Sequence, residues 1–229
     1  MKNPETRLIN GFPFVRYTCP QYASKELISR SAAFYEFMNQ RRSVRDFSDK
    51  PIPREVINNL ILTASTAPSG AHKQPWTFCV VEDAGIKKEI RKAAEEEEYR
   101  SYTSRMSEEW LNAIKPLQTD WHKPFLETAP CLIVVFRRLY ELNDDGSKSN
   151  NYYVSESTGL ACGFLLAAIH HAGLVALTHT PNPMNFLTAI LKRPENERPF
   201  LLIPVGYAAE ETYVPDLTRK KLSEIAVYY

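Results

Sequence analysis

One segment of the chain is apolar on nearly every side, and it limits how the rest can fold. Residues Glu156–His171 have a helical pattern, and their centre, Leu160–Ile169, carries no charged residue. Such a helix is stable in water only when other elements cover it, and it is too short for a bilayer, which takes about 20 residues. Gly173 follows as a usual C-terminal cap. We therefore predict a central core helix in a layered, soluble domain.

Two glycines on this helix indicate a close contact, but they do not identify the element that makes it. Gly159 and Gly163 lie four residues apart on one face, where the missing side chains permit close approach of another element. Packing within the chain and contact with a second subunit both explain them, and the sequence alone does not choose between the two.

The other patterns predict a mixed α+β domain. Apolar, β-branched runs predict strands at Trp76–Val81, Cys131–Arg137, Leu174–Thr178 and Phe200–Val205. Helical spacing predicts further helices at Ser31–Asn39, Arg54–Thr66 and Ile86–Glu98. The elements alternate irregularly, which favours α+β layers over a doubly wound sheet. Prolines interrupt the start of the chain, so we expect an N-terminal arm over residues 1–30 and one domain over 31–229.

Composition excludes several classes of protein. Lys and Arg number 28 against 27 Asp and Glu, a net charge of +1 that argues against a nucleic-acid or membrane-surface binder. The N-terminus lacks a signal-peptide pattern. Four scattered cysteines show no metal-ligand spacing, which predicts buried thiols and no metal site: Cys19, Cys79, Cys131 and Cys162. We expect a cytoplasmic protein that binds neither nucleic acid nor membrane.

Two short segments carry residues suited to a nucleotide. Arg41, Arg42 and Arg45 lie close together around Ser43, and guanidinium groups bind phosphate in bidentate geometry. A solvated basic turn is the alternative. Ala67–Trp76 contains Pro68 and Gly70, so it follows a tight path whose small residues admit a planar ligand, although an ordinary loop would look the same.

Together these segments resemble the nitroreductase superfamily. RRSVRDFS is followed by ASTAPSGAHKQPW, and then by EEEEYRSY, DWHKPFLETAP, LACGFLLAAIHHAGLVALTHTP and PVGYAAEETYVPDLTRK. The similarity runs in order from about Ser31 to Val227 and is strongest to the iodotyrosine deiodinases. It implies a three-layer α-β-α fold with a central, mostly antiparallel sheet. It also implies a domain-swapped homodimer with FMN at the subunit interface.

The resemblance assigns residues to the cofactor. An arginine–serine segment would hold the FMN phosphate and ribityl chain, a proline–serine loop would lie along the isoalloxazine, and a strand end and a late arginine would also contact FMN. The matching positions are Arg41, Arg42, Ser43, Val44 and Arg45; Pro68, Ser69 and Gly70; Thr178, His179 and Thr180; and Arg219. His179 stands where some members have Thr, which leaves the role of its side chain open.

The resemblance also implies a substrate and a reaction. Glu98, Tyr102 and Lys123 match the residues that bind the amino acid end of a halotyrosine, and residues 96–123 match a lid. The backbone N–H of Ala71, with a flavin ribityl hydroxyl, would stabilise the phenolate, and Thr180 would hydrogen-bond flavin N5. These two are the implied catalytic residues in the reductive release of halide from 3-iodotyrosine or 3,5-diiodotyrosine.

The helix that precedes this lid has an unusual charge order. Lys87, Lys88, Arg91 and Lys92 come first and Glu95–Glu98 come last, which opposes the helix dipole. A segment that breaks a local rule is a candidate for function. A solvated helix face with surplus carboxylates is the alternative.

Two other functions remain open at this stage. A general nitro- or quinone reductase using NAD(P)H would share the FMN site but would not need groups for a zwitterion. A flavin-binding sensor or carrier would bind FMN without turnover. For a deiodinase, NAD(P)H is expected to act only indirectly, through a separate reductase partner that the sequence does not identify.

Overall fold

The computed structural model describes residues 5–229 and divides the chain into two compact units, Met1–Gln40 and Arg41–Tyr229. The first unit contains a hairpin of β1 (Thr6–Ile9) and β2 (Phe12–Val15), followed by α1 (Ser24–Asn39). Helix α1 begins seven residues before the start expected from periodicity. Lys25, Glu26 and Leu27 are good helix formers, and their propensity needs no apolar stripe.

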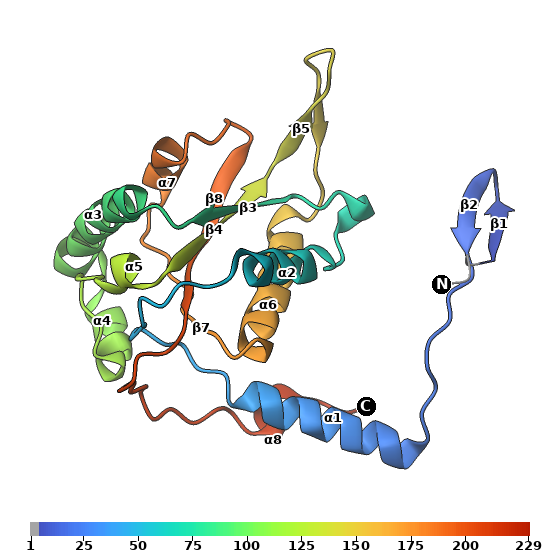
Figure 1. Ribbon diagram of the computed structural model, residues 1–229, viewed down its shortest axis with the longest axis horizontal. Helices are drawn as coiled ribbons and strands as arrows, with labels where there is room; N and C mark the ends of the chain where they lie inside the picture. The colour runs from blue at the N-terminus through green and yellow to red at the C-terminus, as the bar shows by residue number, and fades with distance from the viewer. Residues whose placement is uncertain (1–4) are drawn as a thin grey trace. The chain divides into compact units, whose positions relative to one another are not determined.

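The second unit is built on one antiparallel sheet. Its strands are β3 (Trp76–Val81), β4 (Cys131–Arg138), β8 (Glu197–Gly206) and β7 (Val175–Ala176), in the order β3-β4-β8-β7 (Figure 1). All four predicted strands are present. The run Leu174–Thr178 forms a shorter strand than expected, because only two of its residues pair with β8.

Strand β4 separates two hydrophobic cores. Cys131, Ile133 and Val135 face one core, which contains side chains of α2 (Arg54–Ser65) and α6 (Val154–His171). Leu132, Val134 and Phe136 face the other, beneath α3 (Ala84–Arg100), α5 (Phe125–Thr128) and α7 (Asn185–Ile190). A strand buried on both faces reads as a continuous apolar run. The structure confirms the predicted α+β fold of three layers.

Helix α6 lies in the core, as predicted, but this chain covers only one of its faces. Its buried face includes Ala161, Leu165 and Ile169. On the opposite face Leu160 and Phe164 remain 49% and 41% exposed. Gly163 faces open space, whereas Gly159 touches Phe200. The apolar pattern of the sequence predicts that the helix is buried, but it does not show that this chain leaves one side of the helix exposed.

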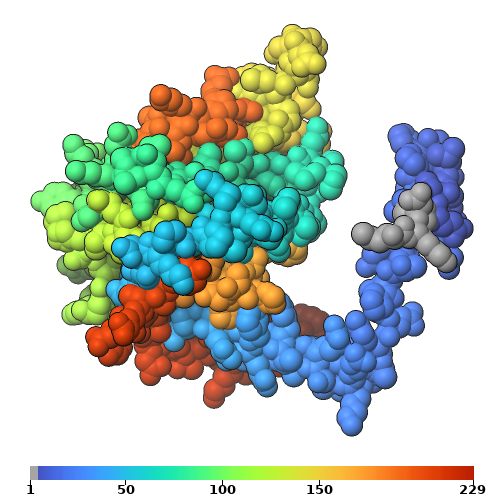
Figure 2. All heavy atoms as spheres, in the orientation of Figure 1, coloured from blue at the N-terminus to red at the C-terminus, as the bar shows by residue number. Residues whose placement is uncertain are grey.

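Several short elements escaped the sequence patterns. A hairpin of β5 (Tyr140–Leu142) and β6 (Lys148–Asn150) projects from this unit, with the polar residues 143–147 at its tip (Figure 2). The others are η1 (Gly70–His72), the π-helical η2 (Ser101–Arg105), α4 (Glu108–Ile114), η3 (Lys115–Leu117) and α8 (Leu222–Ile225). Each is too short to display a period.

The cysteines follow the prediction in part. Cys131 and Cys162 are buried free thiols, as expected, whereas Cys79 is half-buried and Cys19 is exposed. Burial raises the pKa of Cys131 and of Cys162 to about 12, so both remain protonated. Across residues 5–229, no helix combines the length and apolar character that crossing a membrane requires.

Gly70 provides a test of the loop between α2 and β3. A Cβ at this position would lie 2.8 Å from the carbonyl oxygen of Tyr152 and 3.0 Å from the ring of Tyr153. We expect Gly70→Ala to lower the free energy of unfolding by about 1–3 kcal/mol, because the backbone must shift. Urea denaturation measures the loss. Gly159→Ala is the control, since its Cβ would meet only an ordinary contact at 3.9 Å; equal stability of the two variants would contradict the steric argument.

Candidate functional site

The arginine segment lies along the edge of the sheet. Ser43 forms a parallel bridge with Ala176 of β7, and the N–H of Val44 donates to the Ala176 oxygen at 3.1 Å. The Val44 side chain is buried. A few residues later the N–H of Ser48 donates to the carbonyl of Tyr207 at 2.9 Å. Backbone pairing therefore fixes the segment and leaves its arginine side chains to project.

These arginines face one cavity of about 260 Å³, the arginine pocket. Its wall includes five of the predicted cofactor residues together with groups from η3 and the C-terminal segment: Arg41, Arg42, Ser43, Arg45, Leu117, Pro215, Leu217, Thr218 and Arg219. Arg219 donates to the carbonyl of Arg41 at 3.0 Å, and Arg42 donates to that of Pro215. No carboxylate belongs to this wall, so the pocket suits a phosphate.

Electrostatics supports an anion in the arginine pocket. Burial lowers the pKa of Arg41, and the positive charges of Arg219 and Arg42 lower it further. Clustered guanidinium groups repel one another, and a phosphate between them would replace this repulsion by charge-assisted hydrogen bonds.

The proline–serine loop, Pro68–Ala71, has a constrained backbone. Ala71, His72 and Gln74 adopt positive φ values of 49°, 54° and 47°, a region that L-residues rarely occupy and that is common at functional sites. The Ser69 hydroxyl accepts the N–H of Gln74 at 2.9 Å, which helps hold this path. Ala71 is exposed, as a residue that meets a ligand through its backbone must be.

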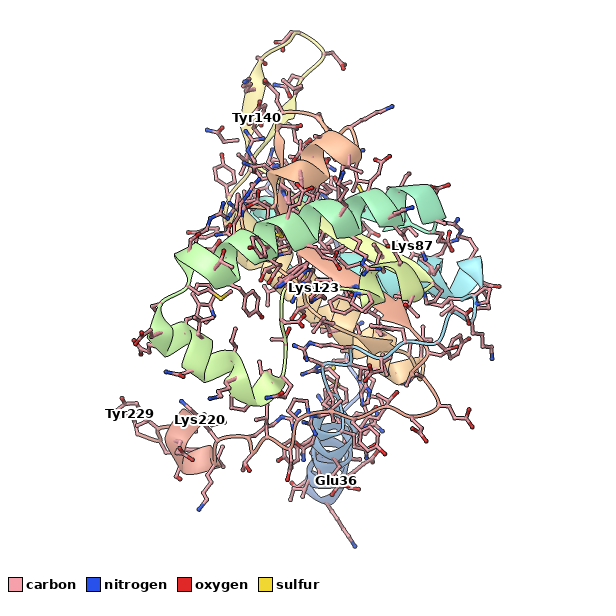
Figure 3. The ribbon with its side chains drawn as sticks, turned by 90° about the vertical axis from the view of Figure 1, so that its left-hand side faces the viewer. Glu36, Lys87, Lys123, Tyr140, Lys220 and Tyr229 are labelled. Carbon is pink, nitrogen blue, oxygen red and sulfur yellow. The ribbon has the colours of Figure 1, made fainter. Side chains whose placement is uncertain are left out.

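Glu98, Tyr102 and Lys123 lie together and are called the clamp below. Nζ of Lys123 lies 3.5 Å from Oε2 of Glu98 and 5.5 Å from the Tyr102 ring centroid. Figure 3 shows Lys123 beside α3, the helix that carries Glu98. It also donates to the Thr119 hydroxyl at 3.2 Å and to the carbonyl of Asp120. The Tyr102 hydroxyl donates to the Thr119 carbonyl at 3.1 Å. Thr119 therefore joins the two ends of the predicted lid, a role that no local sequence pattern signals.

Both charges of the clamp are buried at an energetic cost. The Lys123 and Glu98 side chains are only 4% and 12% exposed. Burial raises the pKa of Glu98 and lowers that of Lys123, and in each case the partner's charge only partly opposes the effect. An ammonium and a carboxylate from one zwitterionic ligand could pair with these two groups and improve their solvation.

His179 lies beside the clamp and next to the end of β7. It pairs with Leu202 of β8 through both backbone hydrogen bonds, while Thr178 and Thr180 on either side are exposed. Its ring is 7% exposed and packs edge-on against Phe125 at 5.6 Å. Burial lowers its pKa to about 3, and Lys123 and Arg45 add to the effect. Within residues 5–229 its buried Nε2 has no hydrogen-bond partner, and the lowered pKa keeps the imidazole neutral.

The structure thus brings the predicted residues into two neighbouring groups and leaves one set apart. Arg45 belongs to the arginine pocket and also acts electrostatically on Tyr102, Lys123 and His179. The proline–serine loop instead lies against the start of α6, where the Gly70 N–H donates to Ser157 at 3.4 Å. Figure 1 shows the start of α6 away from α4, the helix that lies between Tyr102 and Lys123 of the clamp in the sequence.

Comparison with known proteins shows the family to which the fold belongs. The model of the nitroreductase family matches residues 38–207. The chain is 63% identical over 216 residues to an iodotyrosine deiodinase of Haliscomenobacter hydrossis, covering 94% of this chain and 97% of the relative. It is 49% identical to iodotyrosine deiodinase 1 of Homo sapiens, covering 90% and 72%. A crystal structure of oxidized iodotyrosine deiodinase bound to FMN and 3-iodo-L-tyrosine superposes with a TM-score of 0.73 at 31% identity, covering 86% and 98%.

The cost of burying the clamp charges can be measured. The pKa of Glu98 is raised in the folded state, so its ionised form destabilises the fold at pH values above its unfolded-state pKa. The pKa of Lys123 is lowered in the folded state, so its charged form destabilises the fold at pH values below its folded-state pKa. Both costs are therefore present at neutral pH. We expect the double variant Glu98→Met/Lys123→Met to be at least as stable as the parent at pH 7, because two apolar side chains replace a buried ion pair. Its free energy of unfolding should exceed the parent's by up to about 4 kcal/mol. The gain should shrink as pH falls, because Glu98 becomes protonated.

Urea denaturation at pH 7 and pH 4 provides the comparison. Glu96→Met, at an exposed position on the same helix, is the matched control and should gain nothing. A double variant clearly less stable than the parent at pH 7 would show that the ion pair stabilises the fold.

Proposed function

The chain belongs to the nitroreductase family, and we propose that it is an FMN-dependent iodotyrosine deiodinase that reductively removes halogen from halogenated tyrosines. One observation carries the choice of substrate: the buried Glu98–Lys123 pair beside Tyr102. A halotyrosine supplies the ammonium and the carboxylate that such a pair can bind, together with an aromatic ring. The related crystal structure contains 3-iodo-L-tyrosine with FMN.

The arginine pocket contains the kinds of residue that would bind the phosphate of FMN. Arg41, Arg42, Arg45 and Arg219 would neutralise the phosphate, and Ser43 would add a hydrogen bond. Val44 would contribute only backbone, because its side chain is buried. The exposed Thr178 and Thr180 would meet the flavin, with the Thr180 hydroxyl placed at N5. Pro68, Ser69 and Gly70 would lie along the isoalloxazine.

In the proposed reaction the ring carbon–iodine bond breaks, iodine leaves as iodide, and the carbon takes up the proton that reduced flavin would release on oxidation, which yields tyrosine. Reduced FMN, when bound, supplies the two electrons. Lys123 would bind the substrate carboxylate and Glu98 its ammonium, which orients the phenol for reduction. The exposed turn at Ala71 would direct its N–H to the phenolate oxygen.

Residues 96–123 are the proposed lid. It contains η2, α4 and η3, and its two ends meet where Tyr102 donates to the Thr119 carbonyl. Arg105 binds Glu97 at 2.7 Å and the Asn182 carbonyl at 3.2 Å, which ties the lid to the loop after Thr180. Binding of a ligand under these residues would exclude water from the flavin and the phenol.

A homodimer with FMN at the subunit interface would complete the site. The proline–serine loop lies apart from the clamp in one chain, so the loop of one copy would meet the clamp of the other. The exposed Leu160 and Phe164 of α6 offer an apolar surface for this contact, and Gly163 leaves room for close approach. The proposed dimer therefore favours contact with a second subunit, and not packing within the chain, as the role of Gly163.

The cellular setting follows from the same proposal. The free thiols suit a reducing cytoplasm, and a separate reductase partner would pass electrons from NAD(P)H to the flavin. Anaerobic titration of the reduced flavoprotein with 3-iodotyrosine and with a nitroarene tests the function. Stoichiometric iodide release supports a deiodinase, whereas reduction of the nitroarene alone would favour a general nitro- or quinone reductase, and reaction with neither would favour a flavin carrier.

Removal of one pocket arginine should weaken cofactor binding. We expect Arg45→Ala to release FMN, because a charge-assisted phosphate contact worth about 1.5–3 kcal/mol is lost. The flavin retained after purification and its dissociation constant measure the effect. Arg54→Ala, which removes an exposed arginine paired with Glu82, should keep its flavin; an Arg45→Ala protein with parental affinity would contradict the assignment.

Removal of either clamp charge should weaken substrate binding while FMN stays bound. Glu98→Gln and Lys123→Ala each leave a buried charge unpaired, so we expect a loss of about 2–5 kcal/mol in 3-iodotyrosine affinity. Quenching of flavin fluorescence reports this affinity. Reduction of a nitroarene, which has no zwitterion, should survive in both. Parental affinity in both variants would reject the halotyrosine clamp, and Glu89→Gln serves as the control at an exposed glutamate outside the lid.

A further inference from the structure

The reversed charge order of α3 has a structural explanation. Lys87, Arg91, Glu95 and Glu98 recur at helical spacing, so they form one stripe along the helix. Every member of this stripe binds the segment from Lys123 to Ala129, and Figure 3 shows Lys87 and Lys123 at different points along α3.

The cations at the start of the stripe hold the far end of that segment. Nζ of Lys87 is buried and donates to the carbonyls of Glu127 and Ala129 at 2.8 and 2.9 Å. Arg91 donates to the Glu127 carboxylate at 3.1 Å and to Oε1 of Glu95 at 2.8 Å. Carbonyl groups require donors, so cations are the suitable residues at this end of α3.

The anions hold the near end, where Lys123 begins the segment. Oε1 of Glu95 accepts the backbone N–H of Lys123 at 2.7 Å, and the same oxygen accepts from Arg91. Glu98, one turn later, binds the Lys123 side chain. Two carboxylates of one helix thus bind the same lysine, Glu95 through its backbone and Glu98 through its ammonium.

We propose that Glu95 is a positioning residue for substrate binding: it fixes the backbone of Lys123 so that the ammonium is held where the ligand's carboxylate binds. Arg91 fixes the Glu95 carboxylate in turn. The inference rests on the proposed function, because it assigns Lys123 to the halotyrosine carboxylate. It adds a residue outside the clamp that acts only through Lys123.

The proposed role predicts different effects for two substitutions of Glu95. Glu95→Ala loses the acceptor for the Lys123 N–H, and the affinity for 3-iodotyrosine should fall by roughly three- to tenfold, which is the usual net effect of one hydrogen bond. Glu95→Gln keeps an acceptor oxygen and should retain most of the affinity. Glu89→Ala, at an exposed position of the same helix outside the lid, should match the parent.

The experiment uses the FMN-loaded protein and measures flavin fluorescence quenching with two ligands, 3-iodotyrosine and 2-iodophenol. The phenol has no carboxylate, so Glu95→Ala should bind it as the parent does. In steady-state assays KM for 3-iodotyrosine should rise while kcat stays within about twofold. In the Lys123→Ala background Glu95→Ala should cause no further loss, because residues that act as one unit are not additive.

Each result separates this inference from the function on which it rests. Equal loss of affinity for both ligands, an equal loss for Glu95→Ala and Glu95→Gln, or a full further loss in the Lys123→Ala background would overturn the positioning role. So would parental 3-iodotyrosine affinity in Glu95→Ala. Failure of the parent itself to bind 3-iodotyrosine would overturn the proposed function, and this inference with it.

Discussion

Burial of β4 on both faces is the constraint on which the other parts depend. Alternate residues of this strand enter separate cores, so neither helical layer can move without exposing apolar surface. Strand β8 pairs with β4 and also holds His179 through Leu202, while β7 pairs with β8 and holds the arginine segment through Ala176. Helix α5 leads directly into β4 and follows Lys123. The arginine segment is therefore connected to β4 through β7 and β8, and Lys123 of the clamp is connected to it through α5, so one strand buried on both faces supports both groups.

Local patterns predicted the main elements because their cause is local. Trp76–Val81 and Arg54–Ser65 are a strand and a helix that their apolar spacing predicts almost to the residue. The exposed face of α6 was not predictable, since a pattern records which residues avoid water but not which chain covers them. Hairpin β5–β6 and α4 were not predicted because segments of three to seven residues are too short to display a period.

The site was less accessible to sequence reasoning. The cluster from Arg41 to Arg45 was visible as charge, yet a basic turn would look the same, and its meeting with Arg219 depends on the path of the whole chain. The clamp was assigned through resemblance alone, because Glu98 and Lys123 are separated by a lid without clear periodicity. Thr119 acts partly through a backbone carbonyl, which no residue type encodes. Only one sequence feature pointed to Glu95: the charge order of α3. This order is unfavourable for an isolated helix, but it matches the groups of the Lys123–Ala129 segment that α3 binds.

The separation of the proline–serine loop from the clamp has a thermodynamic consequence for the proposed dimer. If each ligand needs groups from both copies, then ligand affinity and subunit affinity are linked, and each must strengthen the other by the same factor. Dilution would lower the apparent affinity for flavin and substrate, while saturation with either would hold the subunits together. The amount of protein in the cell would then regulate the enzyme without any separate effector.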